Sequence, residues 1–165
     1  MGANSRMTTA VHVLTLMSLD HQANEVTTSQ RIAESVNTHA VVIRRCLGDL
    51  HRAGLVRSRR AAGAGWALAR EPEHITLLEM CSAVDAGSPF GMHRTPPNSA
   101  CPVGFRIRPA LRVVYGSLEE RMRKELARTT IADVLREVLV QQRQRIRGLL
   151  GLAPERTSTT SLASS

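Results

Sequence analysis

The side chains best suited to chemistry lie between Thr27 and Leu68, where arginines and small polar residues recur at short spacing. A guanidinium group binds phosphate and can also fork onto the edge of a guanine, so this composition favours double-stranded DNA as the partner. The residues expected to contact DNA are Thr28, Ser29, Gln30, Thr38, His39, Ala40, Val41, Arg44, Arg45, Arg59, Arg60, Gly63 and Gly65.

These residues are expected to make different kinds of contact. Residues 38–41 begin a helix, and side chains at the start of a recognition helix reach base edges. Arg44 and Arg45 follow one turn later and suit either a guanine or a phosphate. Ser29 and Gln30 lie at a helix N-terminus, where backbone N–H groups favour a phosphate.

The glycine-rich stretch after Arg59 and Arg60 suits a wing that approaches the DNA backbone or a narrow minor groove. For Arg57 and Arg59 a solvated surface position is an equal alternative, because neighbouring strand residues face opposite sides. Arg52 is better explained as a charge that complements the C-terminal end of a helix dipole. Trp66 is expected to pack the wing against the body of the protein.

Cys101 is the cysteine with the clearest chemical potential. It precedes Pro102, which is favoured at the first position of a helix, and Arg106 and Arg108 follow. A helix N-terminus and nearby guanidinium groups both stabilise a thiolate, which predicts a thiol that senses oxidants. Two alternatives stay open: Cys101 packs as a small apolar residue, or Pro109 marks the true helix start.

The other two cysteines, Cys46 and Cys81, fall near apolar stripes and are expected in the core. An odd number of cysteines without close pairing predicts no disulfide framework and a reducing cytoplasm. No long apolar run suggests a signal peptide or a membrane span. The sequence indicates no cofactor and no metal site.

The elements that would position these residues follow from apolar spacing and capping residues. Gly54 is expected to end the recognition helix in a left-handed conformation. The predicted helices are Thr8 or Thr9 to Leu19, 29–36 capped by Thr28, 39–53 capped by Thr38, 75–84, a long helix over 106–126, and a last helix capped by Thr129 or Thr130, with strands 55–59 and 66–68. The fold class is therefore mainly α with a small β-hairpin wing: a winged helix-turn-helix plus a long dimerisation helix.

The chain divides by composition into a DNA-binding domain over 1–85, a Gly/Pro/Ser-rich sensor or linker loop over 86–105, dimerisation helices over 106–149 and a disordered tail over 150–165. The 22 Lys and Arg against 14 Asp and Glu give a net charge of +8. A basic DNA-binding domain favours an anionic polymer as partner.

The sequence resembles the Rrf-type winged-helix transcriptional regulators, the family of IscR, NsrR and CymR. The motifs that carry the resemblance lie in residues 50–60, 63–69 and 75–84. Residues 35–45, 101–104 and 124–127 resemble the YwnA-like branch, which lacks an iron–sulfur cluster. Ala62, Ala64 and Trp66 depart from the usual wing.

The resemblance implies a homodimer that represses transcription at a near-palindromic operator, with the long helix crossing the twofold axis. Cluster-binding members carry three cysteines in the loop that here holds only Cys101, so a cluster is not expected. Release by a redox signal at Cys101 is the main hypothesis. The alternative is a small ligand bound between the fourth helix and the long helix. A thiol enzyme is disfavoured for want of a positioned His and Asp, and a protein adaptor by Arg44, Arg45 and Arg60.

Overall fold

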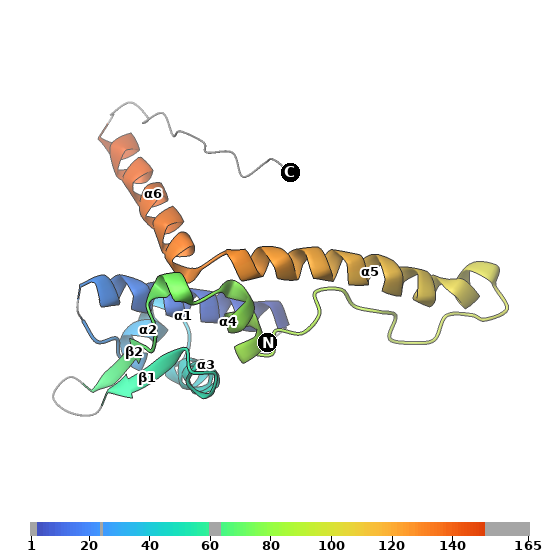
Figure 1. Cartoon of the computed structure of the whole chain (residues 1–165), viewed down its shortest axis with the longest axis horizontal. Helices are drawn as coiled ribbons and strands as arrows, with labels where there is room; N and C mark the ends of the chain where they lie inside the picture. Colours follow the sequence, from blue (N-terminus) through green and yellow to red (C-terminus); the bar gives the residue numbers. More distant parts are fainter. Residues whose placement is uncertain (1–2, 24, 60–63, 151–165) are drawn as a thin grey trace.

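Six α-helices and one two-stranded hairpin make up the described part of the chain, residues 3–23, 25–59 and 64–150 of a computed structural model (Figure 1). The elements are α1 Ala3–Gln22, α2 Ser29–Val36, α3 Ala40–Arg52, β1 Val56–Arg59, β2 Gly65–Leu68, the 3-10 turn η1 Pro72–His74, α4 Leu77–Ala83, α5 Pro102–Arg128 and α6 Ile131–Leu149. We call α1 to α4 with the hairpin the head, and α5 the arm. The helix-rich fold with a small hairpin confirms the fold class predicted from the sequence.

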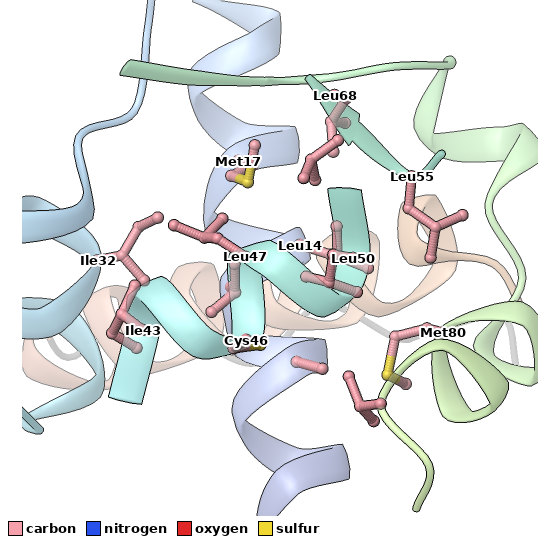
Figure 2. Close-up of a cluster of buried hydrophobic side chains, with 14 of the residues drawn as sticks. Leu14, Met17, Ile32, Ile43, Cys46, Leu47, Leu50, Leu55, Leu68 and Met80 are labelled. Atoms are coloured by element: carbon pink, nitrogen blue, oxygen red, sulfur yellow. The ribbon is translucent and has the colours of Figure 1, made fainter. Parts of the chain in front are cut away.

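The central helix α1 is buried over most of its middle turns, where Val13, Leu14 and Met17 face the core, while Thr8, His12 and Leu19 remain exposed. Figure 2 shows Leu14 and Met17 of α1 packed against α3, which supplies Ile43, Leu47 and Leu50. Burying one such side chain contributes about 1.5–3 kcal/mol. The predicted start at Thr8 or Thr9 was wrong: α1 already includes Ala3.

The helix-turn-helix begins where the sequence predicted. The Thr28 hydroxyl accepts the Arg31 N–H, and α2 ends at Asn37 in the left-handed conformation (φ 55). The cap predicted at Thr38 was wrong, since its N–H closes the end of α2 on Ala33 O at 3.0 Å. His39 is the N-cap of α3 instead and makes no side-chain capping bond.

Gly54 follows α3 with φ 70, a left-handed conformation that confirms the expected helix stop. The chain then forms β1 and β2, which pair antiparallel from Val56 with Leu68 to Arg59 with Gly65. Val56 and Leu68 face the core, whereas the outer end of the hairpin is exposed.

The helix α6 folds back onto α1. Thr130 caps it through a capping box with Asp133, and Thr130 also bridges to Thr76, the N-cap of α4. Ile131 and Leu135 are buried as predicted, whereas Val138 lines a hollow beside α1 and remains 48% exposed.

The arm α5 spans 27 residues and buries none of them. It starts at Pro102, four residues before the predicted start, and Pro109 lies inside it instead of beginning it. Figure 1 shows its N-terminal half extending away from the head. A helix with no buried side chain lacks the tertiary packing that normally stabilises it.

Candidate nucleic-acid interface

The outer face of α3 lies opposite the side chains that hold α3 in the core. Val41, Arg45 and Arg52 recur on it at helical spacing, and Val41 is 69% exposed. Gly48 lies in the same row, and a Cβ added there would meet no protein atom within 4 Å. Gly48 therefore leaves a shallow place on this face between Arg45 and Arg52.

Two arginines on α3 are available to bind an anion. Arg44 and Arg45 are exposed, and neither forms an ion pair within the part of the chain that the structure describes. Arg52 differs, since its guanidinium pairs with Asp49 one turn earlier and also donates to Gly48 O. This supports the prediction that Arg52 belongs to the helix C-terminus and leaves Arg44 and Arg45 as the stronger candidates.

The start of α3 combines small and polar groups. His39 and Val41 are exposed, and Thr38 and Ala40 are half-buried beside them. An exposed valine can contact a thymine methyl, and an exposed histidine can donate to a base or a phosphate.

The N-terminus of α2 lies near the same surface. Thr28 uses its hydroxyl as the cap, while Ser29 is half-buried and Gln30 donates to Glu34 at 3.0 Å. The first N–H groups of a helix have no acceptor within the helix, so this end favours a phosphate.

The wing carries Arg57 and Arg59, both exposed on β1. Gly65, opposite Arg59, has no room for a side chain: a Cβ would lie 2.6 Å from Val26 Cγ1 and 2.9 Å from Thr27 O. A glycine is therefore needed at position 65 because the backbone of Thr27 passes so close to it. Arg60 and Gly63, also predicted to contact DNA, lie outside the described residues.

The predicted base- and phosphate-contacting residues on α2, α3 and β1 gather on one side of the head. Figure 1 shows these elements on the side of α1 that faces away from α5 and α6. The ring of Trp66 meets His51 of α3 edge-on, with centroids 5.9 Å apart, so Trp66 packs the wing against the head as expected.

Cys101 lies at the other end of the molecule, at the free N-terminus of α5. It is the N-cap of that helix and is exposed. The backbone N–H groups of Gly104 and Val103 lower the pKa of its thiol below the ordinary value. The turn of residues 98–101 folds over Gly104, where a Cβ would clash with the carbonyl of Asn98.

The other thiols are protected. Burial, together with the nearby Asp49 carboxylate, raises the pKa of Cys46 to about 11. Burial also raises the pKa of Cys81, which is half-buried on α4. Both lie with the core cluster, as predicted.

The loop between α4 and α5 runs back along the arm. Phe90 stacks on Tyr115 of α5 with centroids 5.0 Å apart, and Ser88 donates to Glu119. A cavity of about 280 Å³ lies between α4, this loop and the C-terminal half of α5, lined by Cys81, Leu126 and their neighbours. A larger apolar hollow of about 570 Å³ is open at the surface between α1 and α6, which are in contact beside it.

Three features of the site escaped the sequence interpretation. Gly48 and Gly104 looked like ordinary glycines, and only the surrounding atoms reveal the open face at one and the crossing turn at the other. The bond between Asp20 and Thr27 joins residues seven positions apart and has no sequence pattern.

A positively charged helix-turn-helix with a hairpin beside it defines the class of winged-helix DNA-binding regulators. The chain belongs to the Rrf2 family, whose model, described as an iron-dependent transcriptional regulator, matches residues 3–137. The resemblance inferred from the sequence is thereby confirmed. Members of this class are transcriptional regulators, and the prediction that the protein is not an enzyme is confirmed as well.

Two relatives are similar over most of the chain. YwnA of Bacillus subtilis (strain 168), named as an HTH-type transcriptional regulator, is 41% identical over 133 residues, covering 80% of this chain and 96% of YwnA. A crystal structure described as that of a DNA-binding protein is 37% identical, with a TM-score of 0.60, over 79% of this chain and 98% of that one.

The oxidised form of Staphylococcus aureus CymR has the same fold. It is 19% identical, with a TM-score of 0.62, over 82% of this chain and 96% of CymR.

The family description names iron, but the described residues do not fit an iron site. No three His, Cys, Asp or Glu side chains among them are grouped as metal ligands. The loop before α5 holds a single thiol, whereas an iron–sulfur cluster needs several. Within the described ranges, no helix has the length and apolar character needed to span a membrane.

Proposed function

We propose that this protein is a homodimeric repressor that binds a near-palindromic operator and is released when the Cys101 thiol is oxidised. The main observation behind the redox step is the position of Cys101: exposed, at a helix N-terminus, with two backbone N–H groups that lower the pKa of its thiol. Such a thiol carries more thiolate at neutral pH than Cys46 or Cys81.

The dimer is inferred from the arm. Large apolar side chains along α5 are exposed, including Phe105 at 59%, Val113 at 76% and Val114 at 52%. An apolar surface of this kind on a single helix calls for a partner helix, and two copies of the arm supply one to each other. Two heads joined in this way meet two half-sites at once, which explains a near-palindromic operator.

The arm also separates the thiol from its own head. A helix of 27 residues is about 40 Å long. In a dimer with crossed arms, the Cys101 end of one copy lies toward the head of the other. Oxidation would therefore act across the dimer, changing the spacing of the two heads instead of blocking a DNA contact.

The chemistry of release is a two-electron oxidation. The Cys101 thiolate attacks one oxygen of a peroxide, the O–O bond breaks, and the products are a sulfenic acid and an alkoxide or hydroxide that takes up a proton. A thiol reductant then condenses with the sulfenic acid to form a mixed disulfide and water. A second reductant thiol releases the free Cys101 thiol again. The protein acts in the cytoplasm, where DNA and reductant are both present.

The test uses a duplex selected by the purified protein from a random library. We expect salt-dependent, saturable binding that is lost with mild peroxide, restored by reductant and insensitive to peroxide in Cys101→Ser. Cys81→Ser is the matched control and should respond like the unchanged protein. Peroxide sensitivity that persists in Cys101→Ser would overturn the redox step, and failure to select any duplex would overturn the repressor.

A second candidate is a repressor released by a small ligand. It is favoured by the cavity of about 280 Å³ between α4 and α5, close to where the arm leaves the head. Under this alternative, Cys101→Ser leaves release unchanged, whereas Leu126→Trp, which fills the cavity, abolishes it.

A further inference from the structure

A buried carboxylate links α1 to the two elements beside α3. Asp20 is 2% exposed near the end of α1. Its Oδ2 accepts the Thr27 hydroxyl at 2.8 Å, and its Oδ1 accepts Arg31 Nη2, also at 2.8 Å. Thr27 is 1% exposed, so this part of the network is closed to water.

Each partner of Asp20 is tied to a different element that is predicted to contact DNA. Arg31 lies in the first turns of α2, directly after the cap at Thr28. Thr27 pairs with the wing: its N–H donates to Trp66 O at 3.1 Å, and its carbonyl accepts the Trp66 N–H at 2.8 Å. One carboxylate thus fixes the start of α2 through Arg31 and strand β2 of the wing through Thr27.

The contact at the wing is tight. Gly65 lies so close to Val26 and Thr27 that a side chain does not fit. Trp66, the next residue, rests on His51 of α3. A displacement of Thr27 therefore moves the hairpin relative to both helices of the helix-turn-helix.

We propose that Asp20 is a positioning residue that sets the angle between the wing and α2, so that both reach the DNA backbone together. Apolar packing alone would hold these elements together without fixing their direction. Directional bonds to a buried carboxylate restrict them to one arrangement, and losing the charge leaves Arg31 without its counterion. The inference rests on the proposed binding of operator DNA and on the wing contact that the sequence predicts.

The experiment compares Asp20→Asn with Asp133→Asn. Asp133 bonds the Thr130 hydroxyl at 2.8 Å and Arg136 Nη1 at 2.8 Å, but it is 39% exposed and lies on α6, away from the elements predicted to contact DNA. The probe is a duplex selected from a random library by the unchanged protein. The measurements are hydroxyl-radical footprints, affinity against salt concentration, and thermal unfolding.

For Asp20→Asn we expect about tenfold weaker binding, since the amide keeps only one acceptor oxygen and cannot hold both the Thr27 hydroxyl and the Arg31 guanidinium. The footprint should lose the protections made by the wing and keep those made by α3. The slope of log affinity against log salt should fall by about one for each lost phosphate contact. Asp133→Asn should keep the footprint and the slope.

A folded Asp20→Asn protein with the unchanged footprint and slope would overturn the proposal, because a merely structural residue changes the unfolding temperature alone. Should Asp20→Asn not fold, Thr27→Val removes only the hydroxyl and keeps the backbone pairing with Trp66. It should show the same selective loss, and an intact wing footprint in Thr27→Val would also overturn the proposal. Protections by α3 without any wing protection in the unchanged protein would overturn the proposal, whereas failure to select any duplex would be a failure of the proposed function.

Discussion

The head and the arm differ in how far they bury their apolar side chains. In the head, α1, α3 and the base of the hairpin close a core in which Leu14, Leu47 and Leu50 are fully buried. In the arm, 27 residues in succession bury none of their side chains. The core of the head closes within one chain, with Ile131 of α6 as part of it, whereas the arm leaves large apolar side chains exposed. Under the proposed function, the DNA contacts of each half-site come from one chain, and the regulation depends on two chains together.

The largest effect on operator affinity should follow from a substitution that prevents the arm from forming a dimer. Val114→Asp places a charge on a side chain that is 52% exposed in the monomer and that we expect to be buried in the dimer. The protein should become a monomer with a folded head, and operator affinity should fall by about 10²–10⁴ because the second half-site no longer binds intramolecularly. Analytical ultracentrifugation and operator titration measure the two effects.

Arg112→Gln is the control for charge, since it lowers the net charge by the same single unit on the opposite side of α5. It should remain dimeric. A Val114→Asp protein that is still a dimer would show that another surface joins the two copies.

The next effect compares Leu47→Ala in the head with Leu118→Ala in the arm. Leu47→Ala should lower the free energy of unfolding by about 2–5 kcal/mol at every protein concentration, because it leaves a cavity in a closed core. Leu118 is 41% exposed, so Leu118→Ala should destabilise only through the dimer, by an amount that depends on protein concentration. Urea unfolding at two protein concentrations separates them, and a concentration-independent loss in Leu118→Ala would count against the arm as the interface.

The features that could be predicted from the sequence are those that depend on residues close together in the chain. The cap at Thr28 and the stop at Gly54 were predicted because each acts on its own turn of helix. Thr38 was misassigned because its N–H is taken by the end of α2, a choice that depends on the left-handed Asn37 before it. The apolar stripe on α5 was recognised, but helical spacing alone does not say whether a stripe meets its own chain or another.

In the candidate site, too, the contacts between distant residues could not be predicted. The sequence predicted Arg44 and Arg45 as DNA contacts from the motif context and Cys101 as a reactive thiol from the proline that follows, and the structure places the three side chains on the surface. The first helix was predicted to end at Leu19, whereas α1 continues to Gln22 and buries Asp20 against residues that come later in the chain. A contact of that kind has no periodicity to reveal it.

Cys101 in the arm and Cys46 in the head should differ in how their reactivity depends on pH. The pKa of Cys101 lies below the ordinary value and that of Cys46 is raised to about 11. Alkylation of Cys101 should therefore reach half its maximal rate at a lower pH than a free cysteine peptide, with Cys46 unreactive in the folded protein. Gly104→Ala should slow Cys101 alkylation near neutral pH, because the added Cβ displaces the turn of residues 98–101 from the helix N-terminus.

Cys46 also predicts a trend in stability. Its folded pKa is raised, so the unfolded chain releases this proton at a lower pH than the folded protein does. The contribution to stability is full below the unfolded pKa of about 8.5 and decreases as pH rises above it. Cys46→Ser should flatten that decrease in urea unfolding between neutral and alkaline pH, while Cys101→Ser should not.

The smallest expected effect is also the most diagnostic for DNA contact. Gly48 of α3 and Gly116 of α5 both have open space where a Cβ would lie, so alanine at either position should stabilise its helix by about 0.5–1 kcal/mol. If α3 lies against DNA through Val41, Gly48 and Arg45, the methyl group of Gly48→Ala keeps the helix from approaching, and operator affinity should fall while thermal stability rises. Gly116→Ala should leave the DNA contacts of the head unchanged. A Gly48→Ala protein that is more stable and binds the operator as tightly as before would show that α3 presents a different face to the groove, with Arg44 instead of Arg45 at its centre.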